Sequence, residues 1–183
     1  MFDAKQEILK FWFKDTEPKQ WFQVNNDFDQ LIRKKFNQVY KLAERNIFDD
    51  WQDNDKGCLA LCILYDQFPR NMFRNTPKAF EKDYEARKIA RKAICNNFDQ
   101  SLTSIEKTFL YLPFEHSENI EDQEHSMELF TKLKDKEPLA YEYALRHYEV
   151  IKEFGRFPHR NLILGRENTK KEEDYLSSPN AGF

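Results

Sequence analysis

The stretch GCLALCILYDQF, residues 57–68, decides the fold because it is apolar on every side of a helical wheel over most of its length. A helix that is apolar all round has to be covered by neighbouring elements on several sides. We therefore predict a central buried helix over 57–68. Pro69 follows it, and because proline lacks a backbone N–H we expect the helix to end there.

Helix signals continue on both sides of this central segment. Thr76 and Pro77 form an N-cap followed by a first-turn proline, which predicts a helix that reaches Asn97. Pro138 opens another predicted helix, and Gly155 is a natural stop for it. Alternating strand patterns do not occur and only 4 residues are glycine, so we expect an all-α protein.

Two capping boxes open shorter predicted helices. Thr103 stands three residues before Glu106, and Thr169 stands three residues before Glu172, which is the spacing of reciprocal side-chain caps. Gly165 should end a brief helix over 159–164. The remaining predicted helices cover residues 3–14, 26–46, 119–135 and 138–154.

Length and composition favour one compact domain. A chain of 183 residues buries roughly 70% of its unfolded surface, and its 17 Phe, 8 Tyr and 3 Trp fill a core with few bulky groups. We predict a single all-helical domain over residues 1–183, built as a compact array of antiparallel helix pairs. Residues 177–183 should form a loose tail.

Charge and hydropathy exclude several classes of partner. The net charge is −3 with 33% charged residues, which creates no field for a polyanion, so we expect no nucleic-acid partner. The longest apolar run, 58–65, is far shorter than the roughly 20 residues of a membrane span, so we expect no membrane partner. The N-terminus does not resemble a signal peptide, and the 3 cysteines form no disulfide framework. We therefore expect a cytoplasmic protein.

Polar residues occupy positions where the helical pattern demands apolar ones. Asp83 lies on an Ala-rich helix face. It must therefore pair with a cation, such as Arg87 or an arginine of another motif, donate as a protonated acid, or lie at the wall of a wet pocket. His147 lies in an apolar stripe, which is typical of a neutral core histidine bonded to a carbonyl or carboxylate. Asp66 and Gln123 are further polar residues on faces that should be short of solvent.

One helix face carries the residue types of a metal site. Glu118, Asp122 and His125 share that face, and carboxylates with a histidine can bind a metal or move protons. An exposed helix face produces the same composition by chance. The sequence contains neither HExxH nor a pair of Glu-x-x-His motifs, so we expect no metal. For the same reasons we expect no metal at Glu115 and His116.

The segment FGRFPHRN (154–161) carries residue types that bind anions. Arg156, His159, Arg160 and Asn161 surround a proline at a predicted helix start, where backbone N–H groups and guanidinium groups favour a carboxylate or phosphate. Three more arginines, in the segments 66–83 and 153–166, extend the set of candidate ligand-binding residues: Arg70, Arg74 and Arg166. The alternative is that the arginines neutralise acidic residues across helices.

The three motifs together resemble a known family. DQFPRNMFR…TPKAFEKD (66–83), FLYLPFEHSE…DQ (109–123) and FGRFPHRN..LGR…T (154–169), in this order and spacing, resemble the bacterial domain of unknown function 924. The resemblance covers nearly the whole chain. It implies an all-helical fold similar to the tetratricopeptide-repeat-like superfamily, and the family offers no established activity or catalytic residues to carry over.

Two functions from different classes fit these residues. The first is an uncharacterised small-anion-binding protein or hydrolase-type enzyme. Its pocket would be walled by Asp66, Arg70, Asp83, His116, His159 and Arg160. His159 or His116 would be the general acid or base, Asp66 or Asp83 would orient it, and the arginines would hold an anionic group.

The second function is a helical module that binds a protein or peptide without catalysis. A third interpretation is a helical core held by ion pairs with no site at all. The sequence contains no cofactor motif such as a P-loop or a dinucleotide fingerprint, so we expect no cofactor. It leaves open whether the protein is an enzyme, and it does not indicate an oligomeric state.

Overall fold

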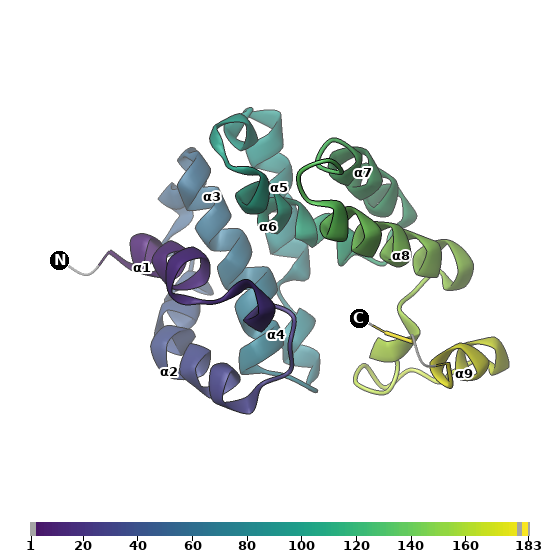
Figure 1. Cartoon of the computed structure of the whole chain (residues 1–183). Coiled ribbons are helices and arrows are strands. Elements are labelled where there is room, and N and C mark those ends of the chain that lie inside the picture. The colour runs from purple at the N-terminus through teal and green to yellow at the C-terminus, as the bar shows by residue number, and fades with distance from the viewer. Residues whose placement is uncertain (1–2, 179–180, 183) are drawn as a thin grey trace. The chain divides into compact units, whose positions relative to one another are not determined.

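The computed structural model describes residues 3–178 and 181–182. In this part of the chain the regular secondary structure is helical and no strand occurs, so the predicted all-α class is confirmed (Figure 1). The chain divides into two compact units. Unit 1 comprises residues 1–74 and 78–113, and unit 2 comprises residues 75–77 and 114–183. The single domain and the tetratricopeptide-like arrangement stay predictions.

Unit 1 is organised around the predicted central helix. The helix α3 packs against α1 and α5, and α2 packs against α4 (Figure 1). The α-helices of this unit are α1 (Ala4–Lys10), α2 (Asn26–Ala43), α3 (Asp55–Cys62), α4 (Phe68–Met72), α5 (Asp83–Cys95) and α6 (Ser104–Glu115), whose last two residues belong to unit 2. Short turns of other helix types lie between them: Phe11–Asp15 and Ile63–Gln67 are π-helical, and Pro18–Gln20, Asp49–Asp53, Pro77–Phe80 and Phe98–Ser101 are 3-10.

Aromatic rings fill the core of unit 1. The ring of Trp12 lies 5.6 Å from that of Phe68 and 5.5 Å from that of Phe109, both in edge-to-face contact. Phe36 stacks on Phe68 at 4.6 Å. These are the separations and orientations that aromatic pairs prefer. Phenylalanine, the commonest large apolar residue of the sequence, therefore builds much of this core.

Pro69 does not end the central helical run, which corrects the sequence prediction. The helix passes from α3 through the π-helical turn Ile63–Gln67 into α4, and Pro69 stands in the first turn of α4. Phe68 N–H donates to the carbonyl of Ile63, five residues back. Pro69 has no N–H to donate, and the π-helical turn before it shifts the hydrogen-bond register of the run, which accommodates the missing bond.

The predicted helix from Thr76 to Asn97 is interrupted. Pro77 opens a short 3-10 turn, and α5 begins only at Asp83. The predicted end is close to the observed one, because α5 ends at Cys95 and Asn97 adopts a left-handed conformation with φ of 58°.

Unit 2 is built on a pair of helices with a smaller C-terminal part. The helix α7 (Ile120–Thr131) packs against α8 (Pro138–Phe154), and α9 (Lys170–Leu176) contacts a 3-10 turn at Pro158–Arg160 (Figure 1). Gly155 ends α8 with φ of 69°, a conformation that glycine adopts without steric cost.

Two smaller predictions concern the C-terminal part of unit 2. The brief helix expected over 159–164 is replaced by the 3-10 turn and a series of hydrogen-bonded turns that end at Gly165, with φ of 65°. The predicted loose tail falls partly on residues 179, 180 and 183, which lie outside the described residues. Gly182, which is described, lies beside the ring of His159.

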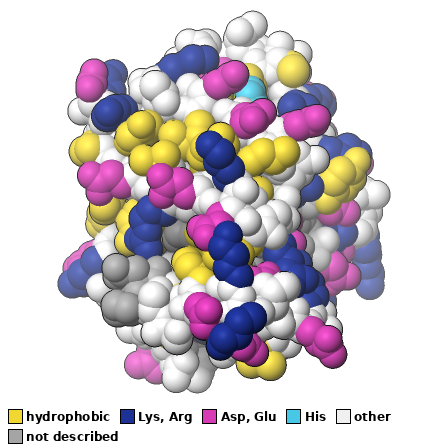
Figure 2. Space-filling model, turned by 90° about the vertical axis from the view of Figure 1, so that its right-hand side faces the viewer, with side chains coloured by type: hydrophobic (Ala, Val, Ile, Leu, Met, Phe, Trp, Pro, Cys, Tyr) yellow, Lys and Arg dark blue, Asp and Glu magenta, His cyan; other side chains and the backbone are white. Residues whose placement is uncertain are grey.

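No helix within residues 3–178 and 181–182 is both long enough and apolar enough to cross a membrane. On the face of the molecule in Figure 2, acidic and basic side chains are interspersed with apolar ones between them. Neither sign of charge dominates that face, as the net charge of −3 leads one to expect.

Candidate functional site

The two carboxylates predicted as catalytic in unit 1 meet at one arginine. Arg70 Nη1 and Nη2 donate to the two carboxylate oxygens of Asp83 at 2.9 and 3.0 Å, and Nη1 lies 3.4 Å from Asp66 Oδ1. Burial alone would lower the pKa of Arg70, but the charges of Asp66 and Asp83 outweigh it and raise that pKa. Asp83 thus has a cation of the kind that the sequence required, Arg70 of the same motif.

Arg74 has a separate carboxylate partner. Its Nε and Nη2 donate to Asp29 at 2.6 and 2.8 Å, and Asn71 Nδ2 donates to Asp29 at 2.8 Å. Sequence reasoning missed Asp29, because an acidic residue in the first turn of α2 looks like ordinary helix capping. Arg74 therefore belongs to a bidentate ion pair, which favours the structural interpretation for this arginine.

In unit 2, Arg156 holds α9. Arg156 Nε and Nη2 donate to the carboxylate of Glu172 at 2.6 and 2.8 Å, and Glu172 also completes the predicted capping box with Thr169. Asn161 Nδ2 donates to the same carboxylate at 3.3 Å. The Arg156 guanidinium, followed by the Thr169 N–H, holds the pKa of Glu172 well below its usual range.

Arg166 forms a second bidentate pair in unit 2. It donates to the two oxygens of Glu118 at 2.6 and 2.9 Å and, through Nε, to Asn161 Oδ1 at 2.9 Å. Phe157 N–H donates to Glu118 as well, at 2.8 Å. Burial raises the pKa of Glu118, but Arg166 and the Phe157 N–H outweigh burial and leave the pKa lowered.

The three residues that the sequence considered as a possible metal site, Glu118, Asp122 and His125, have separate partners in the structure. Glu118 pairs with Arg166, and Asp122 accepts a hydrogen bond from Ser117 Oγ at 2.7 Å. His125 lies 3.5 Å from a carboxylate oxygen of Glu128, and its ring packs edge-on against Phe114. These contacts fit the alternative that the sequence left open, a helix face that carries such residues by chance.

A histidine cluster forms the most concentrated set of ionisable groups in unit 2. We define it by Glu115 at the end of α6, His116, His147 of α8, His159 and Arg160. His147 Nδ1 lies 3.0 Å from Glu115 Oε1, and the rings of His147 and His116 are 5.9 Å apart. Arg160 Nη1 donates to the carbonyl of His116 at 3.1 Å. Segments around residues 116, 147 and 160 thus converge.

Phe157 is the apolar centre of the histidine cluster. Its ring lies 5.5 Å from that of His147 and 5.5 Å from that of His159. The guanidinium of Arg160 stands over the same ring at 4.5 Å, within the range of a cation–π contact. Phe157 is fully buried, and its ring contacts all three of these side chains.

Exposure divides the cluster into an inner and an outer part. Glu115, His147 and Arg160 are buried, whereas His116 and His159 are of intermediate exposure. Burial, and then the electrostatic influence of the neighbouring His116, lower the pKa of His147 well below its usual value and outweigh the hydrogen bond to the Tyr143 carbonyl. His147 is therefore neutral, as the sequence predicted for a core histidine. Because a carbonyl only accepts, its Nδ1 donates to Tyr143 at 2.8 Å.

Gln123 positions the chain segment that supplies two members of the cluster. It is fully buried, and its Nε2 donates to the carbonyls of Glu115 and Ser117 at 2.6 and 2.7 Å. The sequence marked Gln123 as a polar residue on an apolar face, and the structure assigns it this role of fixing the turn after α6.

The comparisons with known proteins agree with this architecture. A family model described as "Bacterial protein of unknown function (DUF924)" matches residues 8–180. The chain belongs to the DUF924 family. Its fold is similar to the solved structure of a protein of unknown function from Agrobacterium tumefaciens, at 38% identity and a TM-score of 0.89. That match covers 94% of this chain and 96% of the other. A comparison with curated proteins gives no match.

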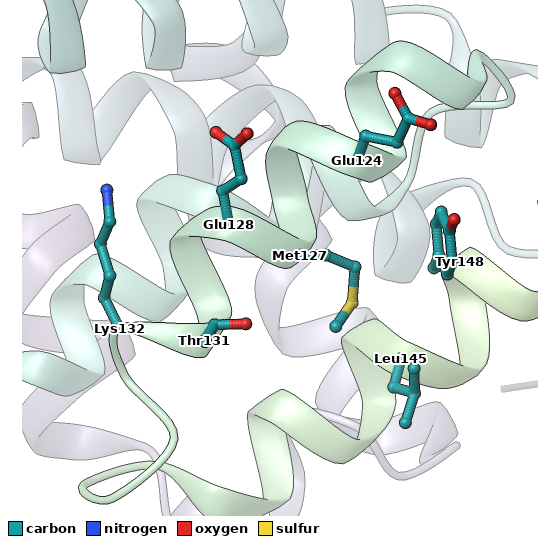
Figure 3. Close-up of a pocket in the computed structure, with 7 residues that line it drawn as sticks. All are labelled: Glu124, Met127, Glu128, Thr131, Lys132, Leu145 and Tyr148. Atoms are coloured by element: carbon teal, nitrogen blue, oxygen red, sulfur yellow. The ribbon is translucent and has the colours of Figure 1, made fainter.

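This DUF924 protein also has an open groove between α7 and α8 (Figure 3). Met127 of α7 points toward Leu145 and Tyr148 of α8, and the carboxylates of Glu124 and Glu128 stand on the rim. The groove contains none of the residues that the sequence singled out for a site. The predicted pocket walled jointly by groups of units 1 and 2 stays a prediction.

Proposed function

We propose that this DUF924 protein is a small-anion-binding protein or a hydrolase-type enzyme whose site is the histidine cluster of unit 2. One observation carries the proposal. Three of the 4 histidines of the chain converge there with a glutamate and an arginine. Ionisable groups that gather beside buried positions, with a shifted pKa among them, are typical of functional sites.

The cluster supports distinct roles for its members. Arg160 would hold an anionic group, because a guanidinium on an aromatic ring remains charged and presents several donors. His159, which is partly exposed, would transfer protons to and from the ligand, and His116 is the second candidate for that role. Glu115 and His147 are buried and hydrogen-bonded, so they would orient the outer residues.

The other predicted site residues are better explained by structural pairing. Arg70, Arg74, Arg156 and Arg166 each make bidentate hydrogen bonds to a carboxylate. We therefore propose that these four ion pairs, with Asp66, Asp83 and Asn161 in them, hold the helices together. This account favours the anion site at the histidine cluster over a wider pocket.

The alternative function, peptide binding, would use the groove between α7 and α8. Met127 is a flexible apolar side chain of the kind that adapts to different partners, and Glu124 and Glu128 would favour basic ones. We rank this function second, because the groove is open and contains none of the residues that the sequence singled out for a site. We also propose a cytoplasmic location, which the three free cysteines support.

The proposal predicts that small anions stabilise the protein. Chelator-treated protein should melt at a higher temperature with phosphate, sulfate or a small carboxylate than without them. An anion at 100 times its Kd adds about 2.7 kcal/mol, or roughly 5–10 °C for a chain of this length. His159→Ala should abolish the rise and leave the melt without anion nearly unchanged.

His125→Ala is the matched control, because His125 lies on α7 and contacts Phe114 and Glu128 instead of the cluster members. It should keep the full response to anions. The proposal is wrong if no anion raises the melting temperature of the wild type, or if His159→Ala responds as the wild type does.

A further inference from the structure

Three members of the histidine cluster have the chemistry and the spacing of metal ligands. Glu115 is the last residue of α6, His116 follows it, and His147 comes from α8. One ligand atom from each of the three lies within 4.8 Å of the others. Among the described residues this is the group of histidine, cysteine and acidic side chains close enough to hold an ion.

The separations are near those that one bound ion imposes. A tetrahedral zinc site with bonds of about 2.1 Å places its ligand atoms about 3.4 Å apart. His147 Nδ1 and Glu115 Oε1 are 3.0 Å apart already. A ligand atom of His116 lies within 4.8 Å of a ligand atom of each of these two side chains.

Neighbouring groups hold the three side chains in position. Gln123 Nε2 donates to the carbonyl of Glu115, and Arg160 Nη1 donates to the carbonyl of His116, so the turn that presents both residues is fixed. Phe157 packs against the His147 ring on its buried side. Metal sites depend on such support from surrounding groups.

We propose that Glu115, His116 and His147 bind a divalent transition-metal ion of the zinc type. The ion takes the place of the proton on His147 Nδ1, which leaves to solvent. The Tyr143 carbonyl then loses this donor but keeps its helical one, His147 N–H, because both residues lie inside α8. Two histidines and one glutamate are a known ligand set for zinc with an open fourth position.

The ligand set also explains why the sequence predicts no metal. HExxH and paired Glu-x-x-His motifs place their ligands on single helices, so a local pattern reveals them. Here the ligands are residues 115, 116 and 147, which only the packed structure brings together. A divalent ion in this place would strengthen anion binding beside Arg160 and make a bound water more acidic.

The proposed metal site and the proposed anion site both lie at the histidine cluster, but the metal site is tested without any anion. Protein without a histidine tag is treated with chelator and titrated with Co2+ and with Zn2+ in a buffer free of phosphate. We expect one ion per chain, with the intense visible absorption of four-coordinate Co2+ that Zn2+ then abolishes. His116→Ala should weaken Zn2+ binding by more than about 100-fold, since even outer-shell changes cost 10–100-fold.

His125→Ala is again the control and should bind Zn2+ as the wild type does. Glu115→Gln is the second ligand variant, and circular dichroism checks that each variant is folded. The inference is overturned if the wild type takes up no ion, or if removing His116 or Glu115 weakens binding no more than removing His125. If phosphate raises the melting temperature but no metal binds, this inference is overturned and the proposed function stands. If metal binds but no anion raises the melting temperature, the inference stands and the proposed function is overturned.

Discussion

At Gly57 the backbone of α3 passes against the carbonyl group of Trp51. A Cβ atom at position 57 would lie 1.9 Å from the Trp51 carbonyl oxygen and 2.7 Å from its carbonyl carbon. No side-chain rotation relieves this contact, because both atoms belong to the backbone. The close approach brings the turn that contains Trp51 onto the N-terminal end of the central helix.

We therefore expect Gly57→Ala to destabilise the protein, although helix propensity alone would favour alanine by about 1 kcal/mol. The backbone has to move, and overpacking of this kind costs about 2–4 kcal/mol. The melting temperature should fall by roughly 5–15 °C in a calorimetric scan.

Gly165→Ala is the control for that experiment. Position 165 has φ of 65°, but a Cβ atom there would meet open space, so only the left-handed conformation costs energy, about 1 kcal/mol. Equal losses for the two variants would contradict the clash at Trp51.

Among the elements of unit 2, α9 is held by ring packing of Tyr175 on Phe154, by an ion pair of Lys171 with Glu153, and by the buried carboxylate of Glu172. Glu172 caps α9 together with Thr169, pairs with Arg156, and is 2% exposed. The short helix has only 7 residues, which is too few for stability on its own propensity. Its position therefore depends on tertiary contacts, which include those of the ionised form of Glu172.

The lowered pKa of Glu172 sets the sign of a pH effect. Its usual value is 4.5 and the folded value is lower, so its stabilising contribution is complete above about pH 4.5 and is lost as the pH falls toward the folded value. At pH 7, Glu172→Gln should cost about 2 kcal/mol, the contribution of hydrogen bonds to a charged group. The gap in melting temperature between wild type and variant should shrink between pH 5 and pH 3.

Glu173→Gln serves as the neighbouring control. Glu173 is 56% exposed at its side chain and lies near Lys170, so its replacement should change stability little at any pH. A gap for Glu172→Gln that stays constant from pH 7 to pH 3 would contradict the structural role of the ionised carboxylate.

At the scale of the whole molecule, the two units carry different spectroscopic reporters. All 3 tryptophans, Trp12, Trp21 and Trp51, lie in unit 1, whereas the 8 tyrosines are spread over both units. Tryptophan fluorescence therefore follows unit 1, and far-ultraviolet circular dichroism follows the helices of the whole chain.

The predicted single domain has a measurable consequence. If the chain unfolds as one cooperative domain, the fluorescence and circular dichroism transitions in urea coincide. Glu172→Gln, a change in unit 2, should then lower both midpoints by the same amount. A variant that shifts the dichroism midpoint and leaves the tryptophan midpoint in place would show that the units unfold separately, and the single-domain prediction would be wrong.

Local sequence patterns were enough to predict the all-α class and many helix boundaries. Capping residues, the apolar run at 57–68 and Gly155 act over three to five residues, so a local pattern is enough to locate them. The capping box at Thr169 and the stop at Gly155 are confirmed for this reason. Pro69 shows the limit, because a π-helical turn changed the hydrogen-bonding partner of a neighbouring residue.

Which side chains contact one another depends instead on how the helices pack. Arg166 pairs with Glu118 across 48 residues of sequence, and Arg160 contacts His116 across 44. The sequence grouped His116, His159 and Arg160 with residues of unit 1 in one site, which stays a prediction. It treated His147 as core and had no means to place Glu115 against it. Helical periodicity states which face a side chain occupies, whereas the partner of that face depends on how separate helices pack.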